Sequence, residues 1–158
     1  MKILIAVDDS AYSKAAMDWA KSMTWPARTE FLVLSAARPL VAAYAVTEVP
    51  ALSYPAEVYE EELKHHEEIS ARYEKQLREH GFKTRALVAQ GDPREAIVDA
   101  AREHAVDLIL VGSHGRSGIS KLVLGSVASH VVTHAPCPVL VVKLNARQTA
   151  EMKARVRS

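Results

Sequence analysis

The sequence has few of the features that mark secreted, membrane-spanning and nucleic-acid-binding proteins. It has 158 residues and one cysteine, Cys137, which cannot form an internal disulfide and therefore fits a reducing compartment. The formal net charge is +1, so the chain as a whole lacks the positive charge that attracts nucleic acid. The apolar run at residues 3–7 is too short for a signal peptide or a membrane span. We therefore expect a cytoplasmic protein that binds neither nucleic acid nor membranes.

Short strand-like segments alternate with segments of helical period along the chain. Strands are expected at residues 3–7, 31–36, 82–89, 108–111 and 139–142. Several of these runs are apolar without alternation, which is typical of a parallel sheet covered by helices on both faces. The length and the hydrophobic content of 49% suit one domain with a sizeable core. The sequence therefore predicts a single-domain α/β fold with an open five-stranded parallel sheet.

The stretch from residue 107 to 127 carries the strongest chemical signal. Its apolar strand leads into Gly112, Ser113, His114 and Gly115, where small residues leave backbone amides accessible. Gly125 and Ser126 then begin a second helical segment, and a helix N-terminus presents unpaired amides to an anion. The spacing is neither the Gly-x-Gly-x-x-Gly dinucleotide fingerprint nor a Walker loop. It nevertheless predicts a phosphate-binding site.

This spacing, in which Gly112 and Gly115 are followed after nine residues by Gly125 and Ser126, resembles the ATP-binding branch of the universal stress protein family. The segments 3–8 and 135–142 match the family too, so the resemblance spans residues 2–143. It implies a Rossmann-like, adenine nucleotide alpha-hydrolase-like fold with strand order 3-2-1-4-5. We expect a universal stress protein domain over residues 1–143 and a basic C-terminal tail over 144–158. The tail could form an amphipathic contact helix, but a frayed terminus is the preferred interpretation.

The resemblance also implies the nucleotide site. Open parallel sheets bind ligands beyond the carboxyl ends of their strands, and Asp8 at such an end could accept hydrogen bonds from ribose hydroxyls. Mg²⁺ or Mn²⁺ could accompany ATP without a dedicated protein cage. The expected nucleotide-binding residues are Ala6, Val7, Asp8, Ala36, Val111, Gly112, Ser113, His114, Gly115, Arg116, Ser117, Gly125, Ser126 and Val127.

A regulatory role with slow or no ATP hydrolysis is expected. Phosphoryl transfer needs a held metal, a cation on the leaving phosphate and a residue that positions the nucleophile, and only the phosphate cradle is recognisable. His114 is interpreted as a structural loop residue because no carboxylate partner for it can be identified. An unidentified regulatory protein partner is expected. A homodimer is also predicted, because the last strand exposes an edge that a second copy can cover, through Val139, Leu140, Val141 and Val142.

Two other functions stay open at this point. Asp8, Asp9 and Asp92, with Ser113 and Lys143, superficially resemble a receiver domain that accepts phosphate on aspartate, although a helix cap explains Asp92 better. A dimeric scaffold that binds no nucleotide is the other alternative.

Two segments outside the glycine motif also carry expectations. Residues 37–56 contain three prolines and predict a flap. Residues 57–80 predict a long helix with a solvated charged face, capped by Gly81. Its adjacent His65 and His66 point in different directions, so they are expected to be partly buried or exposed and to bind no metal together.

Overall fold

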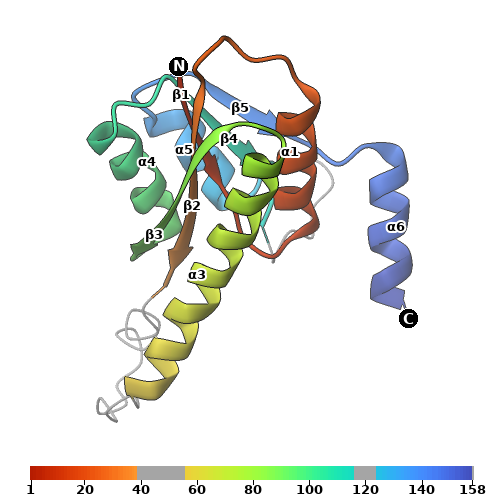
Figure 1. Cartoon of the computed structure of the whole chain (residues 1–158). Coiled ribbons are helices and arrows are strands. Elements are labelled where there is room, and N and C mark those ends of the chain that lie inside the picture. Colours follow the sequence, from red (N-terminus) through yellow and green to blue (C-terminus); the bar gives the residue numbers. More distant parts are fainter. Residues whose placement is uncertain (39–55, 116–123, 158) are drawn as a thin grey trace.

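A five-stranded parallel sheet forms the centre of the molecule. The computed structural model describes residues 1–38, 56–115 and 124–157. The sheet has the order β3-β2-β1-β4-β5, which confirms the predicted topology. Figure 1 shows these elements in place. The strands are β1 (Lys2–Ala6), β2 (Glu30–Ala37), β3 (Lys83–Gln90), β4 (Leu108–Gly112) and β5 (Val139–Val142).

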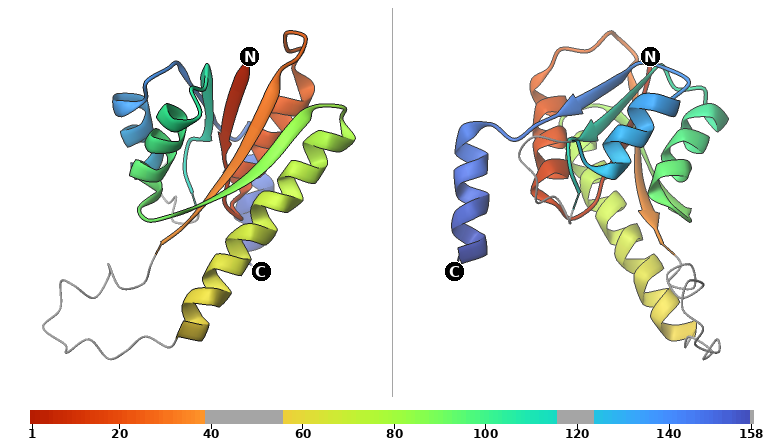
Figure 2. Two further views of the ribbon diagram at one scale, coloured as in Figure 1. Left: turned by 60° about the vertical axis from the view of Figure 1, so that its left-hand side comes forward. Right: turned by 180° about the vertical axis from the view of Figure 1, so that it is seen from behind.

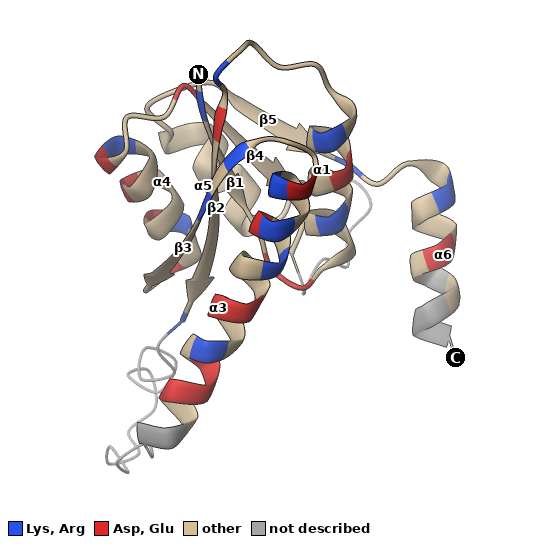
Figure 3. Ribbon diagram, in the orientation of Figure 1, with Lys and Arg blue, Asp and Glu red and all other residues tan. Residues whose placement is uncertain are grey.

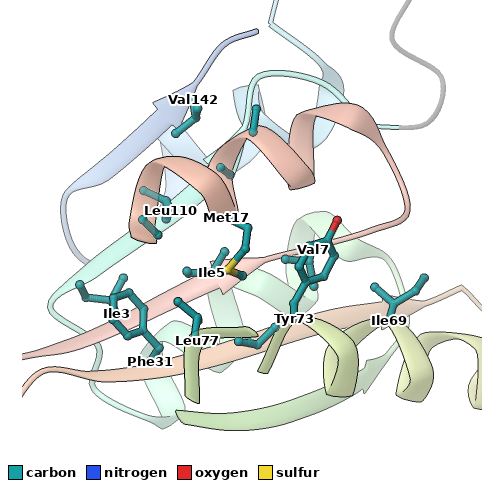
Figure 4. Close-up of a cluster of buried hydrophobic side chains, with 14 residues drawn as sticks. Ile3, Ile5, Val7, Met17, Phe31, Ile69, Tyr73, Leu77, Leu110 and Val142 are labelled. Carbon is teal, nitrogen blue, oxygen red and sulfur yellow. The ribbon is translucent and has the colours of Figure 1, made fainter. Parts of the chain in front are cut away.

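Helices cover both faces of the sheet, as predicted. The helices are α1 (Ala11–Ser22), α3 (Ala56–Glu79), α4 (Pro93–Glu103), α5 (Ser126–His134) and α6 (Ala146–Arg157). On one face, α1 and α3 pack on alternate residues of the central strands through buried side chains such as Met17 and Leu77 (Figure 4). On the other face, α4 and α5 pack through Ile97 and Val131. This division gives the three layers expected of a doubly covered parallel sheet.

Local signals in the sequence account for several helix boundaries. Ser10 caps α1 by accepting a hydrogen bond from the amide of Ser13 (3.2 Å). Asp92 caps α4 through the amide of Arg94 (2.9 Å), and Pro93 occupies the first helical position. Gly81 follows α3 with a φ of +86°, a conformation that favours glycine. The charged residues of α3 lie mainly on its exposed side, as predicted (Figure 3).

The expectation of a frayed tail is wrong. Helix α6 spans Ala146–Arg157 and extends away from the sheet (Figure 2). It begins with a reciprocal cap, in which Asn145 Oδ1 accepts from the amide of Gln148 and Gln148 Oε1 accepts from the amide of Asn145, both at 2.9 Å. An ion pair between Arg147 and Glu151 (3.0 Å) follows one turn later. The proposed flap falls mostly on residues 39–55, which lie outside the described residues.

Candidate functional site

The carboxyl ends of β1 and β4 lie side by side, because these strands pair in the sheet. Here Gly112 ends β4 and passes close to the start of α1. A Cβ atom at Gly112 would lie 2.7 Å from Cβ of Tyr12 and 2.9 Å from its carbonyl carbon, so no side chain fits. Glycine is therefore required at this position by the packing of the chain on itself.

Asp8 follows β1 and its carboxylate is fixed by the start of α1. Its Oδ1 accepts hydrogen bonds from Ser13 Oγ (2.7 Å) and from the amide of Ser10 (3.0 Å). Its Oδ2 has no hydrogen-bond partner among the described residues and lies 2.9 Å from where a Cβ of Gly115 would stand. One oxygen thus holds the carboxylate in place, and the other faces the glycine loop as a free acceptor.

The N-terminus of α5 is held against the same loop. The amide of Gly125 donates to the carbonyl oxygen of Ser113 (2.8 Å), and a Cβ at Gly125 would lie 3.1 Å from Cα of His114. Within the described chain, no side chain caps this helix. The first-turn amides, which include those of Ser126 and Val127, lack intrahelical acceptors and can donate to an anion.

His114 packs inside this loop. Its ring lies 5.1 Å from that of Tyr12, centroid to centroid, and its Nδ1 lies 3.2 Å from Ser113 Oγ. Its Nε2 is buried, and no described residue forms a hydrogen bond with it. Because no carboxylate orients the imidazole within the described residues, the geometry gives no support for acid–base catalysis by His114.

These groups line one cavity of about 620 Å³, within the range of small-molecule sites. Eleven of the predicted residues line it, namely Ala6, Val7, Asp8, Ala36, Val111, Gly112, His114, Gly115, Gly125, Ser126 and Val127. Ser113 is buried behind the wall, where its carbonyl holds Gly125. Arg116 and Ser117 lie outside the described residues.

The remainder of the cavity wall was not predicted. Its further lining residues are Ser13, Leu34, Arg38, His66, Pro93, Ile97, Leu124 and Ala128. Leu34, Ala36, Pro93 and Ile97 form an apolar part of the wall, here called the apolar end. Leu34 could have been predicted as a lining residue. Side chains two residues apart in a strand point to the same face, and Ala36 was already expected in the site. No local pattern indicates His66, since α3 meets β2 only through the tertiary fold.

A charged group stands beside the apolar end. Arg38 lies 4.0 Å from Asp92, which Arg94 contacts more closely (2.6 Å). The hydrogen bond from the Arg94 side chain is the main cause that lowers the pKa of Asp92 to about 2. Capping α4 and pairing with Arg94 account for the position of Asp92, so its geometry does not favour a phosphate-accepting receiver site.

His66 is buried, contrary to the expectation of a partly buried or exposed side chain. It is 2% exposed, whereas the neighbouring His65 side chain is 44% exposed and lies 3.6 Å from Asp9. His66 Nδ1 is 2.7 Å from Ser35 Oγ and its Nε2 is 3.2 Å from Glu62 Oε1. Two polar partners thus accommodate an imidazole inside the protein.

A family model of universal stress proteins matches residues 1–143. The chain belongs to the universal stress protein family. Universal stress protein YxiE of Bacillus subtilis is 30% identical over 147 residues, which cover 90% of this chain and 98% of the relative. This similarity therefore extends well beyond the glycine motif.

Solved structures of universal stress proteins share the fold. The structure of MJ0577 of Methanocaldococcus jannaschii aligns with a TM-score of 0.78 at 28% identity, covering 92% of this chain and 96% of that one. A family member from Arabidopsis thaliana, solved with AMP bound, aligns with a TM-score of 0.65 at 21% identity, covering 94% and 95%. At that identity the second match shows the common fold.

Two absences within the described residues concern metal binding and membrane insertion. Within residues 1–38, 56–115 and 124–157, no three His, Cys, Asp or Glu side chains cluster as metal ligands. In the same ranges, no helix is both long and apolar enough to cross a membrane.

Proposed function

We propose that this universal stress protein binds an adenine nucleotide, ATP in the first instance, in the cavity beyond β1 and β4. The observation that carries the proposal is the convergence of two complementary groups on that cavity. The uncapped N-terminus of α5 at Gly125 offers amides to phosphate, and the free Oδ2 of Asp8 offers an acceptor to ribose hydroxyls. The apolar wall at Leu34 and Ile97 suits a purine base.

In this proposal the protein regulates rather than catalyses. The described part of the site holds no metal-ligand cluster and no carboxylate-oriented base, so we expect slow hydrolysis at most. Mg²⁺ or Mn²⁺ would accompany the phosphates of ATP, bound mainly by those phosphates and by water. Nucleotide occupancy would then alter contacts with a protein partner. The AMP held by the Arabidopsis relative supports the adenine nucleotide class.

Nucleotide binding is tested by extracting freshly purified protein under denaturing conditions and identifying any released nucleotide by chromatography. Calorimetric titration of the emptied protein with ATP, AMP and GTP then gives the selectivity. We expect adenine nucleotides to be recovered and ATP to bind. A folded protein that releases no nucleotide and binds none of the three would overturn the proposal and favour the scaffold alternative.

We further propose that two copies associate through β5 (Val139–Val142). Among the described residues this strand pairs only with β4, so its other edge carries backbone donors and acceptors that a second copy can satisfy. Sedimentation equilibrium at micromolar concentration would give twice the chain mass. Replacing Val141 with proline, which removes one backbone donor, would weaken association, and a wild-type chain that sediments only as a monomer would exclude the dimer.

A further inference from the structure

An arginine from outside the glycine motif borders the cavity. Arg38 directly follows β2, whose Leu34 and Ala36 also line the cavity. Side chains two residues apart along an extended chain point to the same face, so Arg38 continues the row formed by Leu34 and Ala36. The Arg38 side chain is 60% exposed. A positively charged group that solvent can reach therefore lies at the apolar end of the cavity.

The guanidinium of Arg38 is only loosely paired with the protein. Its Nη2 lies 4.0 Å from Oδ1 of Asp92, and among the described residues it has no other ion pair and no hydrogen bond. Asp92 already has a closer partner, because its Oδ2 accepts a hydrogen bond from Nη2 of Arg94 (2.6 Å) and its Oδ1 accepts one from the amide of Arg94 (2.9 Å). An exposed ion pair contributes little to stability, so Arg38 can turn toward a ligand at small cost.

The order of the strands indicates which part of a nucleotide would meet Arg38. Strand β1 lies between β2 and β4, and neighbouring strands are about 4.8 Å apart, so the carboxyl ends of β2 and β4 are separated by about 10 Å. The amides of α5 lie at the end of β4, where Gly125 donates to Ser113. The free acceptor of Asp8 follows β1, between the two. A nucleotide with its phosphates at α5 and its ribose at Asp8 therefore extends its base toward β2 and Arg38.

We propose that Arg38 binds the purine base by stacking its planar guanidinium on the ring. The inference rests on the proposed nucleotide binding and adds a base contact from outside the glycine motif. A guanidinium stacks on flat aromatic rings, and as a cation it is attracted to their faces. Leu34 and Ile97 offer apolar contacts in the same part of the cavity. The base would thus meet apolar side chains of the wall together with a cation that is attracted to its ring.

Calorimetric titration of the full chain compares three probes: ATP, adenosine and inorganic tripolyphosphate. Arg38→Ala is expected to weaken the binding of ATP and adenosine about three- to tenfold, as for loss of one cation–π contact. Tripolyphosphate affinity is expected to change by about twofold at most, because the amides of α5 lie two strands away. Arg38→Lys keeps the charge but lacks the planar group, so its adenosine affinity is expected to lie closer to that of Arg38→Ala than to that of wild type. Arg85→Ala is the matched control, because Arg85 is an exposed arginine of β3 that does not line the cavity.

The outcomes separate this inference from the function on which it rests. Wild type that binds neither ATP nor adenosine refutes the nucleotide site itself, and the base contact with it. Wild type that binds ATP, together with folded Arg38→Ala that binds ATP and adenosine equally well, refutes only the base contact. Weaker binding of ATP and tripolyphosphate by Arg38→Ala, with adenosine affinity unchanged, would mean that Arg38 contacts phosphate and would overturn the inference. Recovery of wild-type adenosine affinity by Arg38→Lys would exclude stacking.

Discussion

Replacing Gly115 with valine tests the site through a contact that the structure defines. The Cβ of any residue here would lie 2.9 Å from Oδ2 of Asp8, closer than real Cβ atoms approach other atoms. The carboxylate cannot turn aside freely, because Oδ1 is held by Ser13 and Ser10. Valine would therefore displace the acceptor proposed for the ribose. Loss of a hydrogen bond to a charged group costs about 1.5 to 3 kcal/mol, or roughly ten- to hundredfold in ATP affinity.

Calorimetric titration of nucleotide-free wild type and Gly115→Val with ATP measures this loss, with circular dichroism as the folding control. A double-mutant cycle with Asp8→Ala shows whether the effect passes through the carboxylate. If it does, Gly115→Val weakens binding less in the Asp8→Ala background than in wild type. Backbone strain does not complicate the result, because Gly115 is not among the described glycines of positive φ. A folded Gly115→Val that binds ATP as tightly as wild type would refute the placement of the ligand.

Three further changes have defined expectations. Ser126→Ala removes an exposed hydroxyl but keeps the amides of α5, so ATP affinity in calorimetry is expected to fall by about 1 to 3 kcal/mol with no change in fold; an unchanged affinity would exclude a hydroxyl contact. Gly112→Ala forces a Cβ within 2.7 Å of Tyr12, so the free energy of unfolding in urea is expected to fall by about 1 to 3 kcal/mol; unchanged stability would contradict the tight packing. Asp92→Asn keeps the helix cap but removes a charge whose pKa is lowered from 3.8 to about 2 in the folded protein. A carboxylate whose pKa is lowered by folding stabilises the fold at a pH above its unfolded pKa. The free energy of unfolding of wild type is therefore expected to exceed that of the variant by less than about 1 kcal/mol at pH 7, and this difference is expected to disappear as the pH falls from 4 to 2. A difference in stability that does not depend on pH would exclude the charge as its cause.

The sheet could be predicted because its determinants are local. Unbroken apolar runs such as residues 108–111 have few alternatives to a buried parallel strand, and the cap at Asp92 and Pro93 marks the next helix clearly. Strand order came from the family resemblance, which the structure and the family match support. The expectation of a frayed tail was wrong because Asn145 and Gln148, three residues apart, cap each other through their side chains and thereby begin α6.

The site was predicted where it follows strand ends and missed where it depends on the packing of distant elements. Asp8 and Gly125 could be found, because a polar or small residue directly after a strand or before a helix has a defined place at the edge of the sheet. His66 could not, because its partner Ser35 is 31 residues away and belongs to a different layer. Its burial depends on the angle at which α3 crosses β2, which the helical period of α3 does not specify.

The glycines of the motif have a physical role that their spacing alone does not reveal. At Gly112, Gly115 and Gly125, the space that a Cβ would occupy is taken by atoms of Tyr12, Asp8 and His114. Because the glycines of the motif have no side chains, β4, the start of α1 and the start of α5 can pack closely against one another. Because the approach is fixed by the chain's own contacts, the acceptor of Asp8 and the amides of α5 are oriented by the fold. A nucleotide that binds there meets preorganised partners, so less of its interaction energy is lost in ordering the protein.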